Sequence, residues 1–436
     1  MRIFRLSFLL FLFVSGVTSV YAKDTVTVFT VDKGDTAWLL ISTALVMLMT
    51  PGLALFYGGM VRRKNVLGTI MQSFIALGVV SLQWAFIGYS LAFGPDKWHF
   101  IGDLSWAGLK GVGMTPNPDY AATVPHQAFM IFQMMFAVIT PALITGAFAE
   151  RFKFKTYLLF LLLWSTFVYC PIAHWVWGVG GWLRDMGTLD FAGGLVVHIS
   201  AGTAALVAAI MVGKRRVHLD EITKPNNLAM TLIGAGLLWF GWFGFNAGSA
   251  LASGSLATSA FVATHLASAA AVMSWIFIEW SERGRPTALG AASGAIAGLV
   301  AITPAAGYVN NFVAILIGLA SGIICYYAVG IKDKFGYDDS LDAVGVHGVG
   351  STFGILMVGL FASKAINPAG GDGLVYGNLH LLGIEALSIL ATMAYSFIVS
   401  WIIFKLLDKT LGLRLKEEDE LEGLDLSQHG ESAYSF

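Results

Sequence analysis

Long apolar stretches separated by short polar connections make up most of the chain. Eleven of them approach the ~20 residues that a helix needs to cross the hydrocarbon core of a bilayer. These stretches begin near Trp38, Val66, Pro125, Tyr157, Gly194, Leu228, Leu256, Ala288, Phe312, Ala343 and His380. The pattern predicts an all-α polytopic membrane protein with eleven transmembrane helices.

The first residues differ from these stretches. Arg2 and Arg5 precede a short apolar run over residues 6–14, and small residues follow it up to Ala22. That run is shorter than a spanning helix, so we expect a signal peptide over residues 1–22 that is cleaved after Ala22. The mature chain then begins with a transmembrane domain over residues 23–408, and residues 409–436 form a tail.

Positive charges in the short connections indicate the orientation, because Lys and Arg concentrate on the cytoplasmic side. Eleven spans place in the cytoplasm the connections with Arg62, Arg63, Lys64, Arg151, Lys153, Lys155, Lys214, Arg215, Arg216, Lys224, Arg283, Arg285, Lys332 and Lys334. The outside connections carry only Lys97, Lys110, Arg184 and Lys364. We therefore expect an outside amino terminus, a cytoplasmic tail and a location in the inner (plasma) membrane.

Composition supports the membrane class and excludes others. Hydrophobic residues make up 56% of the 436 residues and charged residues 12%, while the net charge is −1. No basic field for nucleic acid exists at that charge. The two cysteines, Cys170 and Cys325, lie in apolar spans and are expected to be packing residues rather than metal ligands or a disulfide scaffold. The 50 glycines indicate tight helix packing.

Two histidines inside apolar runs carry the candidate chemistry. His198 follows Asp190, and His347 follows Asp339, each at a distance of eight residues. The surrounding segments, VVHISAGT and GVHGVGST, belong to the fifth and tenth spans, which run in opposite directions. This spacing indicates an inverted repeat of five plus five helices with the eleventh outside it, and a substrate path at the repeat interface.

Neutral imidazole has one donor and one acceptor, so two facing rings can share a proton in a hydrogen bond. The alternative is two unrelated histidines bonded to backbone carbonyls of neighbouring helices. The matched spacing favours the pair. Asp190 and Asp339 precede the two spans, where each carboxylate can cap a helix start; direct ligation of a substrate by Asp190, and a solvated loop position for Asp339, are the alternatives.

Aromatic residues near the expected outer surface suggest a cation site. Trp177 lies there with Trp175 and Trp182, either as part of an interfacial aromatic belt or as a face for an incoming cation. Ser249, at the outer end of the sixth span, offers a hydroxyl. Phe132 and Phe136 lie one helical turn apart on the third span; each alone is typical of packing.

Several strings together resemble the Amt branch of the ammonium transporter (Amt/Mep/Rh) family over nearly the whole mature chain. They are PGLALFYGGMVRRKNVL, CPIAHWVWG, LDFAGGLVVHISAG, WFGFNAGSA, SGAIAGLVAITPAAGY, FGYDDSLDAVGVHGVGS and GLDLSQHGESAY. The tryptophan at 177 and the serine at 249 are similar to the Amt rather than the Rh branch. The resemblance implies an eleven-helix protomer in a homotrimer, with one pore in each protomer.

The resemblance also implies roles for single residues. Trp177, Phe132, Phe136 and Ser249 match the outer ammonium recruitment site, with Asp190 as the acid near it. Phe136 and Phe245 match the stacked pore gate, His198 and His347 the twin histidines, and Trp242 a pore-lining position. The charged tail segment, residues 416–422, by itself indicates a solvated end; the resemblance implies instead a tail packed under the trimer that can receive a PII-type regulatory protein.

Ammonium uptake is the function that these features predict. NH4+ would be recruited outside, lose a proton before the dry constriction, and cross as NH3, with or without separate proton transfer, because a bare cation meets a large desolvation cost there.

A sensor with a PII-type partner is an alternative, disfavoured because no further domain follows the eleventh span. A transporter of larger amines is disfavoured because the spans offer no acid suited to such a substrate. An enzyme is disfavoured because no catalytic, cofactor or metal motif is present.

Overall fold

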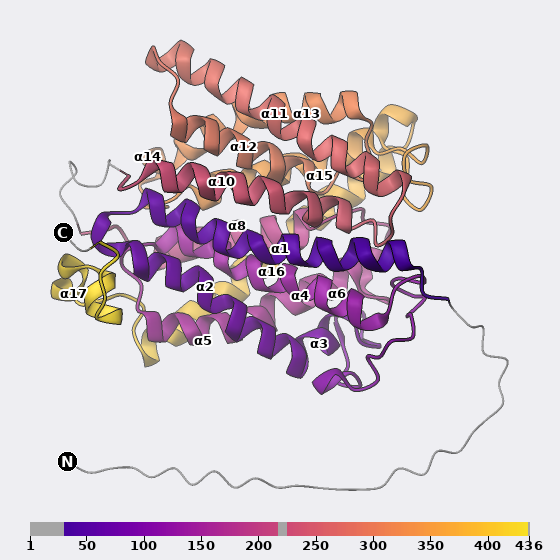
Figure 1. The fold of residues 1–436 in the computed structure, drawn as a ribbon, viewed down its shortest axis with the longest axis horizontal. Coiled ribbons are helices and arrows are strands. Elements are labelled where there is room, and N and C mark those ends of the chain that lie inside the picture. Colours follow the sequence, from indigo (N-terminus) through magenta and orange to yellow (C-terminus); the bar gives the residue numbers. More distant parts are fainter. Residues whose placement is uncertain (1–29, 217–224, 435–436) are drawn as a thin grey trace, which may run out of the picture.

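The computed structural model describes residues 30–216 and 225–434, so the expected signal peptide lies outside the described residues. Within these ranges, ten helices are long and apolar enough to cross a membrane, and Ala288–Ile302 forms a shorter apolar helix. The ten, with the shorter helix, begin close to the eleven predicted positions. The helices run side by side in one bundle (Figure 1).

The spans consist of the following elements: α1 (Lys33–Met60), α2 (Val66–Gln83) with η2 (Trp84–Gly88) and α3 (Tyr89–Phe93), α4 (His126–Phe148), α5 (Phe154–Trp164) with η4 (Ser165–Tyr169) and α6 (Cys170–Trp177), η5 (Gly194–Ile199) with α8 (Ser200–Val212), α10 (Leu228–Trp242) with η6 (Phe243–Ala247), α11 (Ser255–Arg283), α12 (Ala288–Ile302), α13 (Asn311–Val329), η7 (Val344–Val349) with α15 (Gly350–Phe361), and α16 (Leu379–Thr410).

Short elements lie in the connections and the tail: η1 (Arg63–Asn65), β1 (Asp96–Lys97), β2 (Ile101–Gly102), η3 (Ala107–Leu109), α7 (Trp182–Asp185), α14 (Ile331–Phe335), η8 (Leu374–Tyr376), α17 (Glu417–Glu422) and η9 (Asp425–His429). Strands β1 and β2 form an antiparallel pair in which Asp96 faces Gly102. Outside the spans, the described residues thus form mostly turns and short helical segments.

Side-chain caps fix the first turn of five helices. The cap residues are Asp32, Asn227, Thr287, Asn310 and Asn378, and each accepts a hydrogen bond from a backbone N–H of the first turn. These N–H groups have no partner within their own helix, and an unpaired one near a membrane is costly. The sequence therefore sets where these helices start.

Five of the spanning segments contain a π-helical stretch: η2, η4, η5, η6 and η7. A π-helix is rare, and short stretches of it are frequent at functional sites because they redirect side chains. His198 lies in η5, Phe245 in η6 and His347 in η7. Three of the predicted pore residues thus sit in distorted helix turns that hydrophobic periodicity does not reveal.

Glycines let the helices approach backbone to backbone. A β-carbon added at Gly202 of α8 would overlap the backbone nitrogen of Gly348 in η7. Likewise, one added at Gly234 of α10 would overlap the backbone nitrogen of Phe56 in α1. Without a hydrophobic drive between helices in lipid, such contacts supply the packing energy. The Gly202–Gly348 contact brings the two histidine-bearing segments together.

Residues 411–434 pack against one end of the bundle, which we call the tail end; Figure 1 shows this segment in yellow beside α2 and α5. Glu420 is buried and accepts two hydrogen bonds of 2.9 Å from the Arg414 guanidinium. Asp425 accepts the Gly68 N–H at 2.9 Å, at the start of α2. The charge of residues 416–422, taken alone, predicted a solvated end, and that prediction is wrong for Glu420, which is buried.

Ion pairs tie the connections of the tail end together. Arg62 bonds Glu150 at 2.9 Å, and Arg215 bonds Asp338 at 2.8 Å. Burial raises the pKa of the Asp338 carboxyl, but the hydrogen bonds and charge of Arg215 outweigh burial, so that pKa is lowered. Arg151 is buried and donates to backbone carbonyls, including that of Gly213 at 2.8 Å. Basic residues of the connections thus also hold this end in shape.

Gly202→Ala tests whether the close approach of α8 and η7 stabilises the bundle. The new methyl group must push the two backbones apart, at a cost of ~1–3 kcal/mol, so we expect a lower thermal midpoint of the purified protein in detergent. Gly236→Ala is the matched control, because its β-carbon meets nothing within 4 Å. Equal midpoints for the two variants would contradict the packing argument.

Candidate functional site

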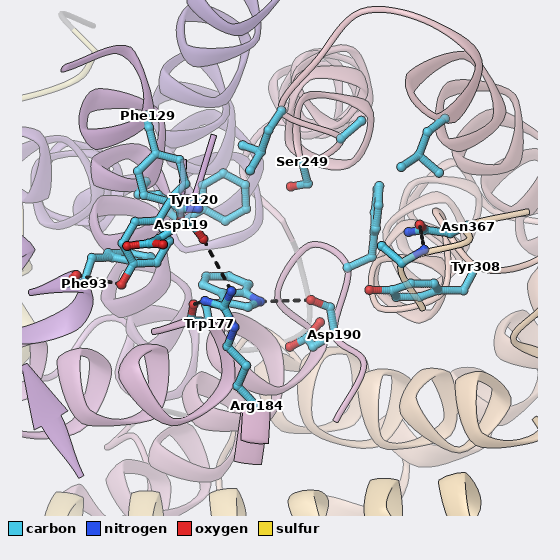
Figure 2. A pocket seen from close by; sticks show the side chains of 17 residues that line it. Phe93, Asp119, Tyr120, Phe129, Trp177, Arg184, Asp190, Ser249, Tyr308 and Asn367 are labelled. Carbon is cyan, nitrogen blue, oxygen red and sulfur yellow. Dashed lines mark hydrogen bonds between the residues drawn. The ribbon is translucent and has the colours of Figure 1, made fainter. Parts of the chain in front are cut away.

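A cavity of about 290 Å³ lies at the end of the bundle opposite the tail, which we call the vestibule end. Trp177, Ser249 and Phe136 line it, together with Asp190. Figure 2 shows Trp177 and Ser249 on two sides of this space. The structure thus brings together residues from α4, from α6 and from the turn that follows η6, which are far apart in the sequence.

Trp177 is held at both its ring and its backbone. Its indole Nε1 donates to the backbone oxygen of Asp190 at 2.9 Å, as Figure 2 shows, and its own carbonyl accepts from Arg184 at 2.6 Å. Phe136 meets the Trp177 ring edge-on, with centroids 6.0 Å apart at 87°. The indole is therefore fixed in one orientation, with its ring at the cavity.

Ser249 offers an acceptor to the cavity. Its hydroxyl donates to the carbonyl of Phe245 at 2.8 Å, one helical turn earlier. A hydroxyl has one donor and two acceptor lone pairs, so a hydroxyl that already donates to its helix can still accept. A ligand that donates N–H bonds fits this oxygen and the aromatic faces beside it.

Phe132 does not line the cavity. Its side chain is fully buried and packs against Phe136, with ring centroids 5.0 Å apart at 64°. It also lies behind Gly248, where an added β-carbon would come within 2.9 Å of the Phe132 ring. In this structure Phe132 therefore supports Phe136, and its contact with a ligand stays a prediction.

Phe136 lines the vestibule cavity, and Phe245 lines the space beside the histidines. The two phenylalanine rings stack with centroids 4.2 Å apart at 27°, and both side chains are buried. On the side away from the vestibule, the Phe245 and His198 ring centroids are 6.0 Å apart. The two phenylalanines thus separate the vestibule from the histidines.

The imidazoles of His198 and His347 lie next to each other in the interior, with their Nδ1 edges facing. Their Nδ1 atoms are 3.2 Å apart and the rings are nearly parallel at 14°. Since one Nδ1 must donate and the other accept, one proton lies between the two Nδ1 atoms when both rings are neutral. The Nε2 atom of His198 has no hydrogen-bond partner among the described residues and so can meet a passing molecule.

The space around the pair is narrow and apolar. Trp242 stacks on His198 with centroids 5.5 Å apart, and its Nε1 is bonded to Thr303 at 2.9 Å. The cavity beside the pair has a volume of about 10 Å³, roughly what a single water molecule needs. Its other lining residues are Met49, Leu53, Phe56, Ile139, Leu143, Val197, Leu238, Phe245 and Ile296. A hydrated cation has no room there.

Asp190 caps the fifth span. Its two carboxylate oxygens accept four backbone N–H bonds of 2.6–3.3 Å, from Gly193, Gly194, Leu195 and Val196. Burial raises the pKa of this carboxyl, and the four hydrogen bonds oppose that effect. Because both oxygens are engaged by the backbone, the geometry supports the cap over direct ligation.

Asp339 does the equivalent at the tail end. It accepts the N–H groups of Ala343 at 3.1 Å and Val344 at 2.8 Å, where η7 begins. The side chain is buried rather than solvated. Burial, with the nearby Asp342 charge, raises its pKa to about 6. Two aspartates at opposite ends of the bundle therefore hold the two histidine-bearing π-helices in the same way.

Sequence reasoning missed other residues at the vestibule end. Gln133, Tyr308 and Asn367 line the cavity, and no spacing signal in the chain marks them.

A second omission had a signal in the sequence: Glu385 lies in the apolar run of the last span and is fully buried. An acid inside a spanning segment is rare and usually functional. The expectation that the spans offer no acid suited to a larger amine substrate did not consider Glu385.

Comparison with known proteins places this geometry in a family. The family model described as "Ammonium Transporter Family" matches residues 37–434. The chain belongs to the ammonium transporter family. Within residues 30–216 and 225–434, no three or more His, Cys, Asp or Glu side chains of this protein lie together in a way that could hold a metal ion.

Two relatives within the ammonium transporter family cover nearly all of the chain. An ammonium transporter of Bacillus subtilis is 54% identical over 92% of this chain and 98% of its own length. The ammonium transporter Amt1 of Archaeoglobus fulgidus is 50% identical over 92% and 99%. Identity at this level over whole chains makes the protein a multi-pass membrane protein of the same kind.

Solved structures agree with the fold of this family member. The structure of Candida albicans Mep2 has a TM-score of 0.84 and 38% identity, and covers 89% of this chain and 88% of that one. A structure described as "Sensor Amt Protein" has a TM-score of 0.83 and 31% identity, and covers 91% and 98%. The helical fold is thus that of Amt and Mep proteins.

Asp190→Ala tests the cap. It leaves four backbone N–H groups without a partner, so we expect a loss of ~3 kcal/mol or more in the free energy of unfolding, measured by thermal denaturation in detergent. Asn310→Ala is the control, since it removes a single cap bond of 3.0 Å to Val313 and should cost ~1 kcal/mol. An Asp190→Ala variant as stable as Asn310→Ala would refute the structural role.

Proposed function

We propose that this protein takes up ammonium by recruiting NH4+ at the vestibule, removing a proton there, and conducting NH3 past His198 and His347. One observation carries the proposal: stacked phenylalanine rings close the path above a hydrogen-bonded histidine pair in an apolar lumen of about 10 Å³. The names of the whole-chain relatives support ammonium as the substrate.

The vestibule suits a small cation with several N–H donors. The Trp177 ring offers an aromatic face, worth ~0.5–2 kcal/mol for a cation, and Ser249 offers an acceptor oxygen. Potassium is attracted by the same aromatic faces, but it has no N–H to donate to Ser249. Recruitment therefore prefers ammonium without excluding potassium completely.

Selection is completed at the constriction. An ion that enters an apolar lumen without its water meets a desolvation cost of several kcal/mol or more. Ammonium can avoid that cost by leaving a proton behind, whereas potassium cannot. The free Nε2 of His198 offers NH3 a polar contact in an otherwise apolar passage. The proton then either returns outside or follows the histidine pair inward.

We further propose eleven membrane-spanning helices with Ala288–Ile302 as the eighth, a 5+5 inverted repeat, and a homotrimer. The caps by Asp190 and Asp339 at opposite ends support the repeat. The distribution of Lys and Arg supports an outside vestibule end and a cytoplasmic tail end in the inner membrane, where a PII-type protein can reach the tail.

A sensor is the second candidate, because a structure described as "Sensor Amt Protein" is similar to this chain at 31% identity. A sensor needs ammonium to change its signalling, whereas a transporter needs net flux. Growth on limiting ammonium of a host strain without its own transporters separates the two. Rescue of growth by this protein would favour the transporter.

Purified protein in proteoliposomes tests the proposed function. An ammonium jump should produce uptake, seen as an alkaline shift of an internal pH dye if NH3 enters alone or as an inward current if a proton follows. An equal jump in potassium should produce neither, because potassium cannot shed a proton. Potassium flux comparable to the ammonium response, or no response to ammonium, would sink the proposal.

His198→Ala and His347→Ala test the histidine pair. Each variant removes the Nδ1–Nδ1 bond, so we expect an ammonium response reduced at least tenfold or a new potassium leak. The exposed His265 on α11 supplies the control variant His265→Ala, which should behave as wild type. Unchanged ammonium flux together with unchanged potassium exclusion in both pair variants would count against a role for the pair.

A further inference from the structure

Glu385 is a buried carboxyl that the transport path does not use. It lies in the second turn of α16, the last span, and its side chain is fully buried. Its Oε1 atom accepts the backbone N–H of Leu189 at 2.7 Å. Its Oε2 atom has no hydrogen-bond partner among the described residues. Burying an acid in a membrane-spanning helix costs free energy, so a buried acid there usually has a structural or functional role.

A second contact from the same helix face holds the neighbouring residue. Ser388, three residues after Glu385, donates its hydroxyl proton to the carbonyl of Ile384 at 2.8 Å. Its oxygen therefore accepts from the Thr188 hydroxyl, which lies at 2.7 Å. Residues 188 and 189 are thus fastened to α16 by two hydrogen bonds.

The fastened segment leads directly into the vestibule. The next residue is Asp190, whose backbone oxygen accepts the Trp177 indole N–H at 2.9 Å and whose carboxylate caps η5. Any shift of residues 188–189 therefore moves both the anchor of the Trp177 ring and the start of the helix that carries His198. The contacts from α16 control the geometry of two parts of the site at once.

We infer that Glu385 is a positioning residue, which through its hydrogen bond to Leu189 fixes Asp190 and thereby holds Trp177 in the orientation that recruits ammonium. This inference rests on the proposed function for its transport consequence, but not for its structural one. It also gives the last span, which lies outside the proposed repeat, a defined task at the vestibule.

The inference is tested by Glu385→Ala against Glu385→Gln. Glutamine keeps an oxygen that accepts the Leu189 N–H, whereas alanine does not. We expect Glu385→Ala to raise the ammonium concentration for half-maximal uptake about fivefold to tenfold, the effect of losing one buried hydrogen bond, with maximal uptake within about twofold of wild type. Glu385→Gln should stay within about twofold in both.

Hydrogen exchange supplies a readout that does not depend on transport. In Glu385→Ala we expect faster amide exchange across residues 186–196 and unchanged exchange elsewhere. Glu279→Ala is the matched control: Glu279 is also a buried helical acid, and it accepts a backbone N–H of a connection, that of Thr287 at 2.9 Å. That variant should raise exchange around residues 284–290 and leave the half-maximal ammonium concentration unchanged.

Should Glu385→Ala fail to fold, Thr188→Val removes only the second fastening contact and should shift both readouts in the same direction by a smaller factor. Unchanged exchange over residues 186–196 in Glu385→Ala would overturn the inference. So would a Glu385→Gln variant as impaired as Glu385→Ala, because then the charge rather than the accepted bond matters. Absence of ammonium uptake by the wild-type protein would contradict the proposed function instead. The exchange comparison would still test whether Glu385 positions residues 188–190.

Discussion

In the hydrocarbon of a bilayer, a polar group finds its partner within the protein or remains unpaired at a cost of several kcal/mol. The arrangement of this protein follows from how its few interior polar groups meet that constraint. Asp190 and Asp339 accept from the N–H groups at the starts of two π-helices, and His198 and His347 pair through their Nδ1 atoms. The caps fix where the two histidine-bearing segments begin, and the histidine pair joins those two segments to each other.

The same constraint accounts for selection by the proposed pore. The vestibule cavity offers a cation aromatic rings and polar side chains, whereas beyond Phe245 the lining is almost entirely apolar. The stacked pair Phe136 and Phe245 marks the boundary between these two environments. A species that becomes neutral crosses it with little desolvation cost, so one structural boundary serves recruitment on one side and exclusion on the other.

Much of the fold could be predicted from the chain because a bilayer imposes a simple rule on length and polarity. Spans long and apolar enough to cross appear close to where the apolar stretches begin, and the resemblance of several strings pointed to the family whose model matches residues 37–434. The matched Asp–His spacing also pointed to the two histidines. The paired segments do meet in space, at the contact of Gly202 with Gly348.

Other features required the tertiary structure. The cap role of Asp190 depended on which N–H groups lie within reach of its oxygens, and the exclusion of Phe132 from the cavity depended on how α4 is rotated. The burial of Glu420 in the charged tail depended on two contacts. One is with Arg414, six residues earlier, and the other is with the end of the bundle, which is formed by residues far away in the sequence.

What the sequence determined by itself was therefore the membrane class, the approximate span positions, the family and the residue types available for chemistry. These follow from local hydrophobicity and from motifs, which are properties of contiguous residues. What only the tertiary structure decided was which polar atoms pair across helices, including the bond of Glu385 to Leu189. Such pairing depends on helix rotation and separation, and those are set by side-chain packing among segments distant in the chain.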